Sequence, residues 1–149
     1  MQRVAVVSFA NSREAFQALL ECVYQLDCLY LHSVPDCPRI YESGVRFRPE
    51  DRDCPDGTCQ EERFCTIPVV LRARVGDCDD LAPWRAAELT VRDGIPARPV
   101  IVPVGPHSWH VVVQLADGRV EDPSALLGMH EYNRRAREER VRRFGGARR

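Results

Sequence analysis

The sequence predicts a single α+β domain in which helices from the N-terminal half pack on a small antiparallel sheet. Three observations carry this prediction: helical apolar spacing after Ser12, a second capped helix after Asp77, and β-rich runs around a tight-turn signal at Asp117-Gly118. With 149 residues and 44% hydrophobic residues, the chain is long enough for one packed core. We therefore interpret residues 1–149 as one domain, with its core at about residues 66–128 and a basic C-terminal helix and tail at 131–149.

The N-terminal helix is predicted from a cap and one apolar face. Ser12 is a suitable N-cap, and helical spacing then places apolar residues at Ala15, Phe16, Leu19, Leu20, Val23 and Tyr24. Pro35 and Pro38 end this segment. The preceding run Val4 to Phe9 is either a short strand or the approach to the helix.

The segment Val75-Gly76-Asp77-Cys78-Asp79-Asp80 places a cysteine in the first turn of a second helix. Asp77 is a good N-cap, and Asp80 three residues later completes an acidic capping box. The helix is expected to run to about Arg92, before Asp93-Gly94. Pro83 does not suit a helix interior, so it predicts a kink or a later start.

The sheet is predicted from three runs, Ala97–Val104, Trp109–Leu115 and Arg119–Asp122. Pro99 and Pro103 make the first run an edge strand or a short strand. Asp117-Gly118 joins the other two runs as a hairpin, which places His110 and Asp122 on neighbouring strands at similar heights.

This order of residues predicts a thiol triad. Cys78 is the candidate nucleophile, because a helix N-terminus and a nearby imidazole both favour a thiolate. His110 would act as the base and Asp122 would orient its ring, while the backbone N–H of Cys78 would donate to an oxyanion. Taken singly, a structural cysteine, a surface histidine and a turn aspartate are the commoner interpretations; the combination favours the triad.

Four further residues are assigned to substrate binding: Trp109, Asp80, Tyr41 and His107. His107 competes with His110 for the role of base, but its place in a Gly-Pro turn suits a substrate rim better. Tyr41, Trp84 and Trp109 are the candidates for a second oxyanion donor. Asp79 and Asp80 oppose thiolate formation as neighbouring carboxylates, so we assign them to helix capping and to attraction of a cationic substrate.

The chain has seven cysteines, and four of them raise a metal question. Only Cys54-x4-Cys59 approaches the spacing of a zinc pair, with Cys37 before it and Cys65 after it. Zinc, a loop disulfide and free thiols are the three interpretations, and free thiols are favoured for a cytosolic chain. We predict no metal site and no cofactor.

Charge and hydropathy narrow the class of protein. The formal net charge is −1, which predicts no nucleic-acid binding, and no apolar run is long enough to span a membrane. All 21 basic residues are arginine, so lysine chemistry is excluded. The short apolar N-terminus is not typical of a signal peptide, and we expect a cytoplasmic protein. The basic C-terminus, with eight arginines against two glutamates over residues 134–149, is either a solvated helix or a docking element for a protein partner.

The ordered motifs resemble the transglutaminase-like superfamily, which has a papain-related core. The matching residues are Gly76 to Ala82, Ala87 to Arg98, Trp109 to Val113 and Asp117 to Ser124. The resemblance implies Cys78, His110 and Asp122 as the triad and a protein or peptide as substrate, with hydrolysis or amide transfer as the reaction. Tyr41 to Phe47 is also similar to small transglutaminase-like proteins of bacteriophages. The alternative is therefore a non-catalytic assembly protein, associated with a phage virion or tail, that keeps the fold for binding.

Overall fold

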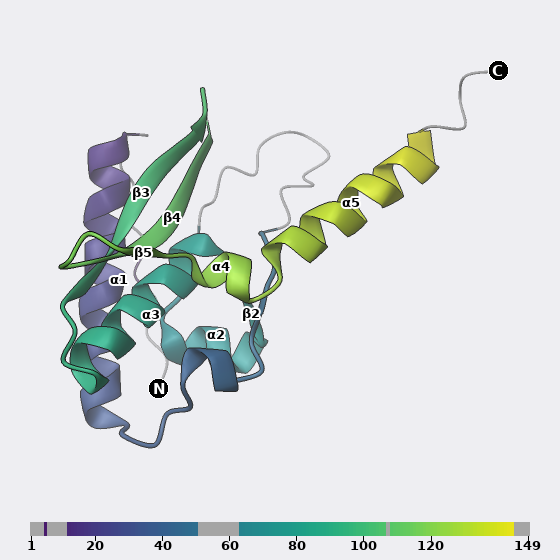
Figure 1. The fold of residues 1–149 in the computed structure, drawn as a ribbon. Coiled ribbons are helices and arrows are strands. Elements are labelled where there is room, and N and C mark those ends of the chain that lie inside the picture. Colours follow the sequence, from purple (N-terminus) through teal and green to yellow (C-terminus); the bar gives the residue numbers. More distant parts are fainter. Residues whose placement is uncertain (1–4, 6–11, 51–62, 107, 145–149) are drawn as a thin grey trace.

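The computed structural model describes residues 5, 12–50, 63–106 and 108–144. The elements follow in the order α1 (Arg13–Ser33), η1 (Ile40–Glu42), β1 (Arg46–Phe47), α2 (Ile67–Ala73), β2 (Val75–Gly76), α3 (Cys78–Arg92), β3 (Ala97–Gly105), β4 (Ser108–Leu115), β5 (Val120–Glu121), α4 (Pro123–Leu126) and α5 (Met129–Phe144). The described residues thus form a mixed α+β structure with a small antiparallel sheet, as the sequence predicts (Figure 1). None of these helices is long and apolar enough to cross a membrane.

The main sheet has three antiparallel strands in the order β3-β4-β5. Val102 of β3 pairs with His110 of β4. Val113 of β4 pairs with Glu121 of β5, so the hairpin predicted from Asp117-Gly118 is confirmed. Gly118 supplies the positive φ of +87° that the tight turn between β4 and β5 requires. One face of the sheet packs on α1 and α3 through a core cluster that includes Leu20, Ala82, Ala86, Leu89, Ile101, Val111 and Val113.

Strand β3 lies at the edge of this sheet, as its prolines predict. The carbonyl groups of Pro99 and Ile101 accept hydrogen bonds from side chains of α1. Gln17 donates to Pro99 over 3.0 Å, and Arg13 donates to Ile101 over 3.3 Å. The first helix therefore covers the open side of β3 as well as one face of the sheet.

Helix α3 begins at Cys78 because the predicted capping box forms. Asp77 is the N-cap, and the carboxylate of Asp80 accepts from the Asp77 backbone N–H over 3.4 Å. Pro83 lies inside the continuous helix, so the later start that it suggested is wrong. A proline at this position loses one hydrogen bond, and the cap and the buried flanks of α3 outweigh that loss.

Several elements differ from the prediction. The end of α1 at Ser33 agrees with the predicted stop before Pro35, whereas the following differences concern other elements. Residues 67–73, expected only to lead into the cysteine motif, form α2, and a short parallel pair joins β1 to β2. The segment after Asp122 forms α4, with Pro123 at its first position. Predictions for residues 4 and 6–9, for Cys54 and Cys59, and for His107 lie outside the described residues.

Asp27 connects α1 to α2 through the core. Its fully buried carboxylate accepts the backbone N–H of Ile67 over 2.8 Å. Thr66, the N-cap of α2, makes no side-chain capping bond, so Asp27 supplies the missing acceptor from another helix. Burial raises the pKa of Asp27 to about 8, although the Ile67 hydrogen bond opposes this shift.

This raised pKa predicts a pH-dependent stability. In the unfolded chain Asp27 ionises near pH 4, whereas the folded chain keeps its proton to about pH 8. The stabilisation is therefore full below about pH 4 and is lost as the pH rises to about 8. Asp27→Asn removes this titration and keeps an acceptor for Ile67. Relative to wild type, its free energy of unfolding should rise by up to about 4 kcal/mol between pH 5 and pH 8.

Urea unfolding of both proteins at the two pH values measures this change. The matched control is Asp36→Asn, which removes a carboxylate at an exposed position, and the pH-dependent gain should be larger for Asp27→Asn than for this variant. A constant difference between Asp27→Asn and wild type across this range would contradict the prediction.

Candidate active site

Cys78 is the first residue of α3 and is partly buried. Its side chain packs against the core cluster that α3 shares with the sheet. The first backbone N–H groups of a helix point out of its end, and the helix dipole is positive there. The predicted helix-start position of the candidate nucleophile is therefore confirmed.

His110 and Asp122 are in direct contact. Nε2 of His110 lies 2.8 Å from Oδ2 of Asp122, and the two side chains are 14% and 28% exposed. Asp122 is also the N-cap of α4, where Oδ1 accepts the Ala125 backbone N–H over 3.2 Å. Both of its oxygens are thus engaged, which fixes the direction from which Asp122 meets the imidazole.

The alternation of side chains along β4 explains where this pair lies. Val111 and Val113 belong to the cluster that packs on α1 and α3. His110 lies between exposed Trp109 and buried Val111, and it points to the other face of the strand. This position keeps the imidazole half-buried and outside the core, where Asp122 reaches it.

Three elements that contact one another carry the three residues. α3, β4 and α4 pack pairwise, so the helix that begins at Cys78, the His110 strand and the helix that Asp122 caps are mutual neighbours. The structure gives a direct contact for His110 and Asp122. A bond between the Cys78 thiol and the imidazole is part of the proposal made below.

An ion-pair network that the sequence analysis missed ties β5 to α3. Arg85 Nε lies 2.6 Å from Glu121, the neighbour of Asp122, and Arg85 NH1 lies 2.7 Å from fully buried Glu88. Glu88 also accepts the Ile40 backbone N–H over 3.0 Å. The i,i+3 spacing of Arg85 and Glu88 was a visible signal, but their link to Glu121 depends on the tertiary fold.

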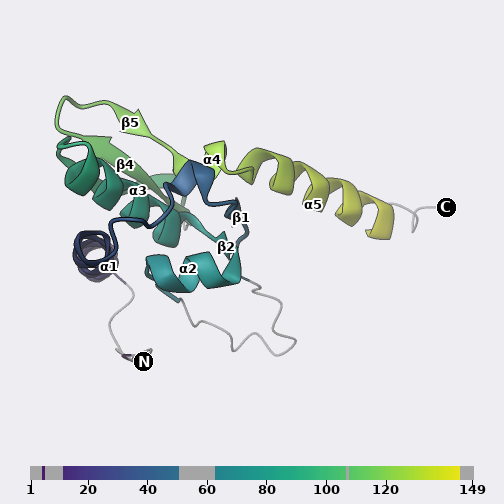
Figure 2. The same cartoon turned by 90° about the horizontal axis from the view of Figure 1, so that it is seen from below.

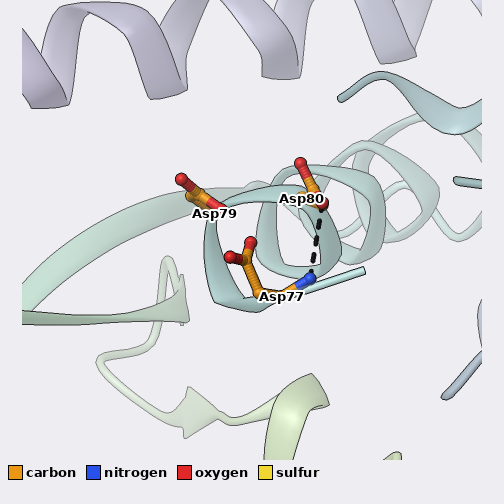
Figure 3. Close-up of side chains that lie close together, drawn as sticks. All are labelled: Asp77, Asp79 and Asp80. Carbon is orange, nitrogen blue, oxygen red and sulfur yellow. Dashed lines mark hydrogen bonds between the residues drawn. The ribbon is translucent and has the colours of Figure 1, made fainter. Parts of the chain in front are cut away.

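Three carboxylates surround the start of α3: Asp77, Asp79 and Asp80 (Figure 3). Their oxygens lie within 4.8 Å of one another. Asp80 uses both of its oxygens on backbone donors, Cys65 N–H at 2.6 Å and Asp77 N–H at 3.4 Å. Within the described chain a metal ion would find grouped ligands only here, yet Asp80 is already committed to these bonds. We therefore assign this cluster to capping.

The protonation of Asp79 changes the expected effect of these carboxylates on the thiol. Asp79 is 1% exposed, and neither oxygen accepts from a donor among the described residues. Burial, and next the adjoining Asp77 carboxylate, raise the pKa of Asp79 well above its usual range. The raised pKa favours the neutral form of Asp79, which can donate a hydrogen bond to Asp77. The objection that a charged Asp79 opposes a Cys78 thiolate is correspondingly weakened.

The residues assigned to substrate binding have different surroundings in the structure. Trp109 is 39% exposed beside His110 in the chain, and its ring lies 6.0 Å from that of Phe16. Asp80 is buried in the cap, so it cannot attract a substrate from solvent. Tyr41 donates its hydroxyl to Glu121, and Arg85 lies 5.1 Å from the centre of its ring.

The remaining candidates are less suited to the site. A second core cluster joins α3 to α2 and η1 and includes Ile40, Ile67, Val70 and Leu81. Trp84 is fully buried in this second cluster, which makes it a core residue and not an exposed oxyanion donor. Cys37 is buried and Cys65 partly buried, both as free thiols. Burial, and next Asp80, raise the pKa of Cys65 to about 12, so this thiol is a poor nucleophile.

Comparisons with known proteins assign neither a family nor a function to this chain. No protein-family model matches the chain, and searches of curated proteins and of solved structures find no match. The chemistry of the site must therefore be argued from its own residues.

The Arg85 network predicts a large stability loss on truncation. Arg85→Met removes the closest cation from buried Glu88, and removing one partner of a buried ion pair costs about 3 kcal/mol. Urea unfolding followed by circular dichroism measures this loss. Arg39→Met, which breaks the more exposed pair with Asp93, should have a much smaller effect. Equal losses in the two variants would count against the network.

Proposed function

We propose that this protein is a thiol enzyme that cleaves or transfers amide bonds through Cys78, His110 and Asp122. The observation that carries the proposal is the 2.8 Å contact between His110 and Asp122, on elements that pack against the helix starting at Cys78. A capped helix start supplies the positive potential that a nucleophilic cysteine needs. The predicted resemblance to transglutaminase-like proteins supports the same roles.

In this proposal each ring nitrogen of His110 has its own role, which follows from the contact with Asp122. If Nε2–H of His110 donates to Asp122, Nδ1 is the acceptor available for the thiol proton. Asp122 holds this tautomer and stabilises the imidazolium that forms. The N-cap bond from Ala125 keeps the carboxylate in place during the proton transfer.

The reaction would proceed through an acyl-enzyme. Nδ1 of His110 takes the Cys78 proton, and Sγ forms a bond to the substrate carbonyl carbon. The C–N bond then breaks, and the imidazolium returns the proton to the leaving amine. Water attacks the thioester in the second half, gives its proton to His110 and releases the acid while the thiol re-forms. An amine in place of water gives transfer; we propose peptide or isopeptide hydrolysis as the main reaction.

Thiol labelling across pH tests the proposal. Iodoacetamide should modify Cys78 at about pH 6, well below the ~8.5 at which free cysteine ionises. Peptide mass spectrometry then compares Cys78 with Cys22, an exposed free cysteine on α1. We expect Cys78 to react at least about tenfold faster at this pH in spite of its partial burial, because a thiolate is the reacting form.

Two variants separate the roles of the partners. His110→Ala should shift the Cys78 profile to higher pH, and Asp122→Asn should shift it less, because the imidazole remains. The Cys22 profile serves as the internal control in each protein. A Cys78 rate no greater than that of Cys22 would contradict the enzyme and favour a binding protein that keeps the fold.

A further inference from the structure

Helix α5 extends away from the rest of the domain (Figures 1 and 2). Residues 130–143 are all exposed, and the first turn is held by Tyr132, whose ring lies 6.0 Å from that of Phe47. Helices of this length are marginally stable in water without a packing partner. Beyond its first turns, α5 therefore presents side chains to solvent and not to a core.

The acidic residues of α5 share one side of the helix. We define the inner face as the side of the helix that contacts the domain in the first turns and its continuation along α5, with Glu131, Tyr132, Arg135, Glu138, Glu139 and Arg142. Glu131, Tyr132 and Arg135 line a cavity of about 350 Å³ together with Arg46 and Phe47, which marks this orientation. The three glutamates of α5 fall within about 100° of the helix circumference.

The opposite side carries arginines alone among its charged residues. This outer face consists of Arg134, Arg137, Arg140 and Arg143, one every three residues, which together cover about half of the circumference. Arg134 and Arg135 form ion pairs with the inner-face residues Glu138 and Glu131. Arg137 and Arg140, at the centre of the outer face, form no ion pair with any described residue.

We propose that the outer face of α5 binds the phosphate backbone of double-stranded DNA. The helix has six arginines and three glutamates, a formal charge of +3 on a chain whose net charge is −1. Guanidinium groups pair with phosphate in bidentate geometry, and phosphate contacts need no apolar anchor. The outer face is complementary in charge to such a backbone along its whole length.

Other anionic partners fit this face less well. A helix that docks in a protein groove presents apolar anchors at i, i+3, i+4 and i+7, and a helix that lies on a membrane needs an apolar face. Val141 is the single large aliphatic side chain beyond the first turn among residues 133–143. DNA also suits a projecting helix better than duplex RNA, because the major groove of B-DNA admits an α-helix and that of A-form RNA does not.

Fluorescence anisotropy with a labelled DNA duplex of about 20 base pairs and mixed sequence tests this inference. The full-length wild type is compared with Arg137→Gln/Arg140→Gln and with the matched inner-face control Arg135→Gln/Arg142→Gln. Both variants lose two charges, and glutamine keeps a high helix propensity. Circular dichroism verifies the helix content of each protein.

We expect the outer-face variant to bind about tenfold more weakly at about 50 mM salt, with a salt dependence reduced by about two phosphate contacts. The control should stay within about threefold of wild type, because its two arginines share the inner face with the three glutamates of α5. No binding by wild type, or equal losses in the two variants, would overturn the proposal. Tighter binding to duplex RNA or to polyglutamate would equally overturn the choice of DNA.

Discussion

The burial of α3 on two sides is the constraint on which the rest of the structure depends. Ala82, Ala86 and Leu89 pack toward the sheet and α1, while Leu81, Trp84 and Ala87 pack into the second cluster with α2 and η1. A helix enclosed in this way cannot rotate or slide without opening a cavity in one cluster. The place of its first residue, Cys78, is therefore set by the core and not by the preceding loop.

Several carboxyl groups are buried in and around α3, and they are stabilised either by a cation or by protonation. Glu88 is neutralised by Arg85 and accepts a backbone N–H. Asp27 keeps a proton and caps α2 from a distance, and burial beside Asp77 raises the pKa of Asp79 and favours its neutral form. Where no cation is within reach, protonating a buried carboxylate requires less free energy than burying its charge without a partner. Asp80 is the fourth buried carboxyl group among the described residues, so three of the four lie where α2 and α3 begin.

The sequence predicts elements whose signals are local. Apolar periodicity after Ser12, the capping box of α3 and the Asp117-Gly118 turn lie within short windows, and all three are confirmed. The capping role of Asp27, the link from Arg85 to Glu121 and the β1-β2 pair depend on residues 29 to 40 positions apart, which no window contains. For the site, the hairpin was enough to bring His110 to Asp122. The local arginine excess over residues 134–149 was visible in the sequence, whereas the distribution of these charges around α5 depends on the helix that the structure shows.

The covered edge of β3 limits how a peptide could be recognised. Many sheets bind extended peptides by accepting them as an additional strand. On β3, Thr90 satisfies both backbone groups of Ala97, side chains of α1 occupy the next two outward carbonyls, and the prolines have no N–H to donate. β5, at the other edge, pairs over only two residues. Main-chain pairing of a peptide along β3 is therefore disfavoured, and the same covered edge protects β3 from pairing with a second copy of the chain.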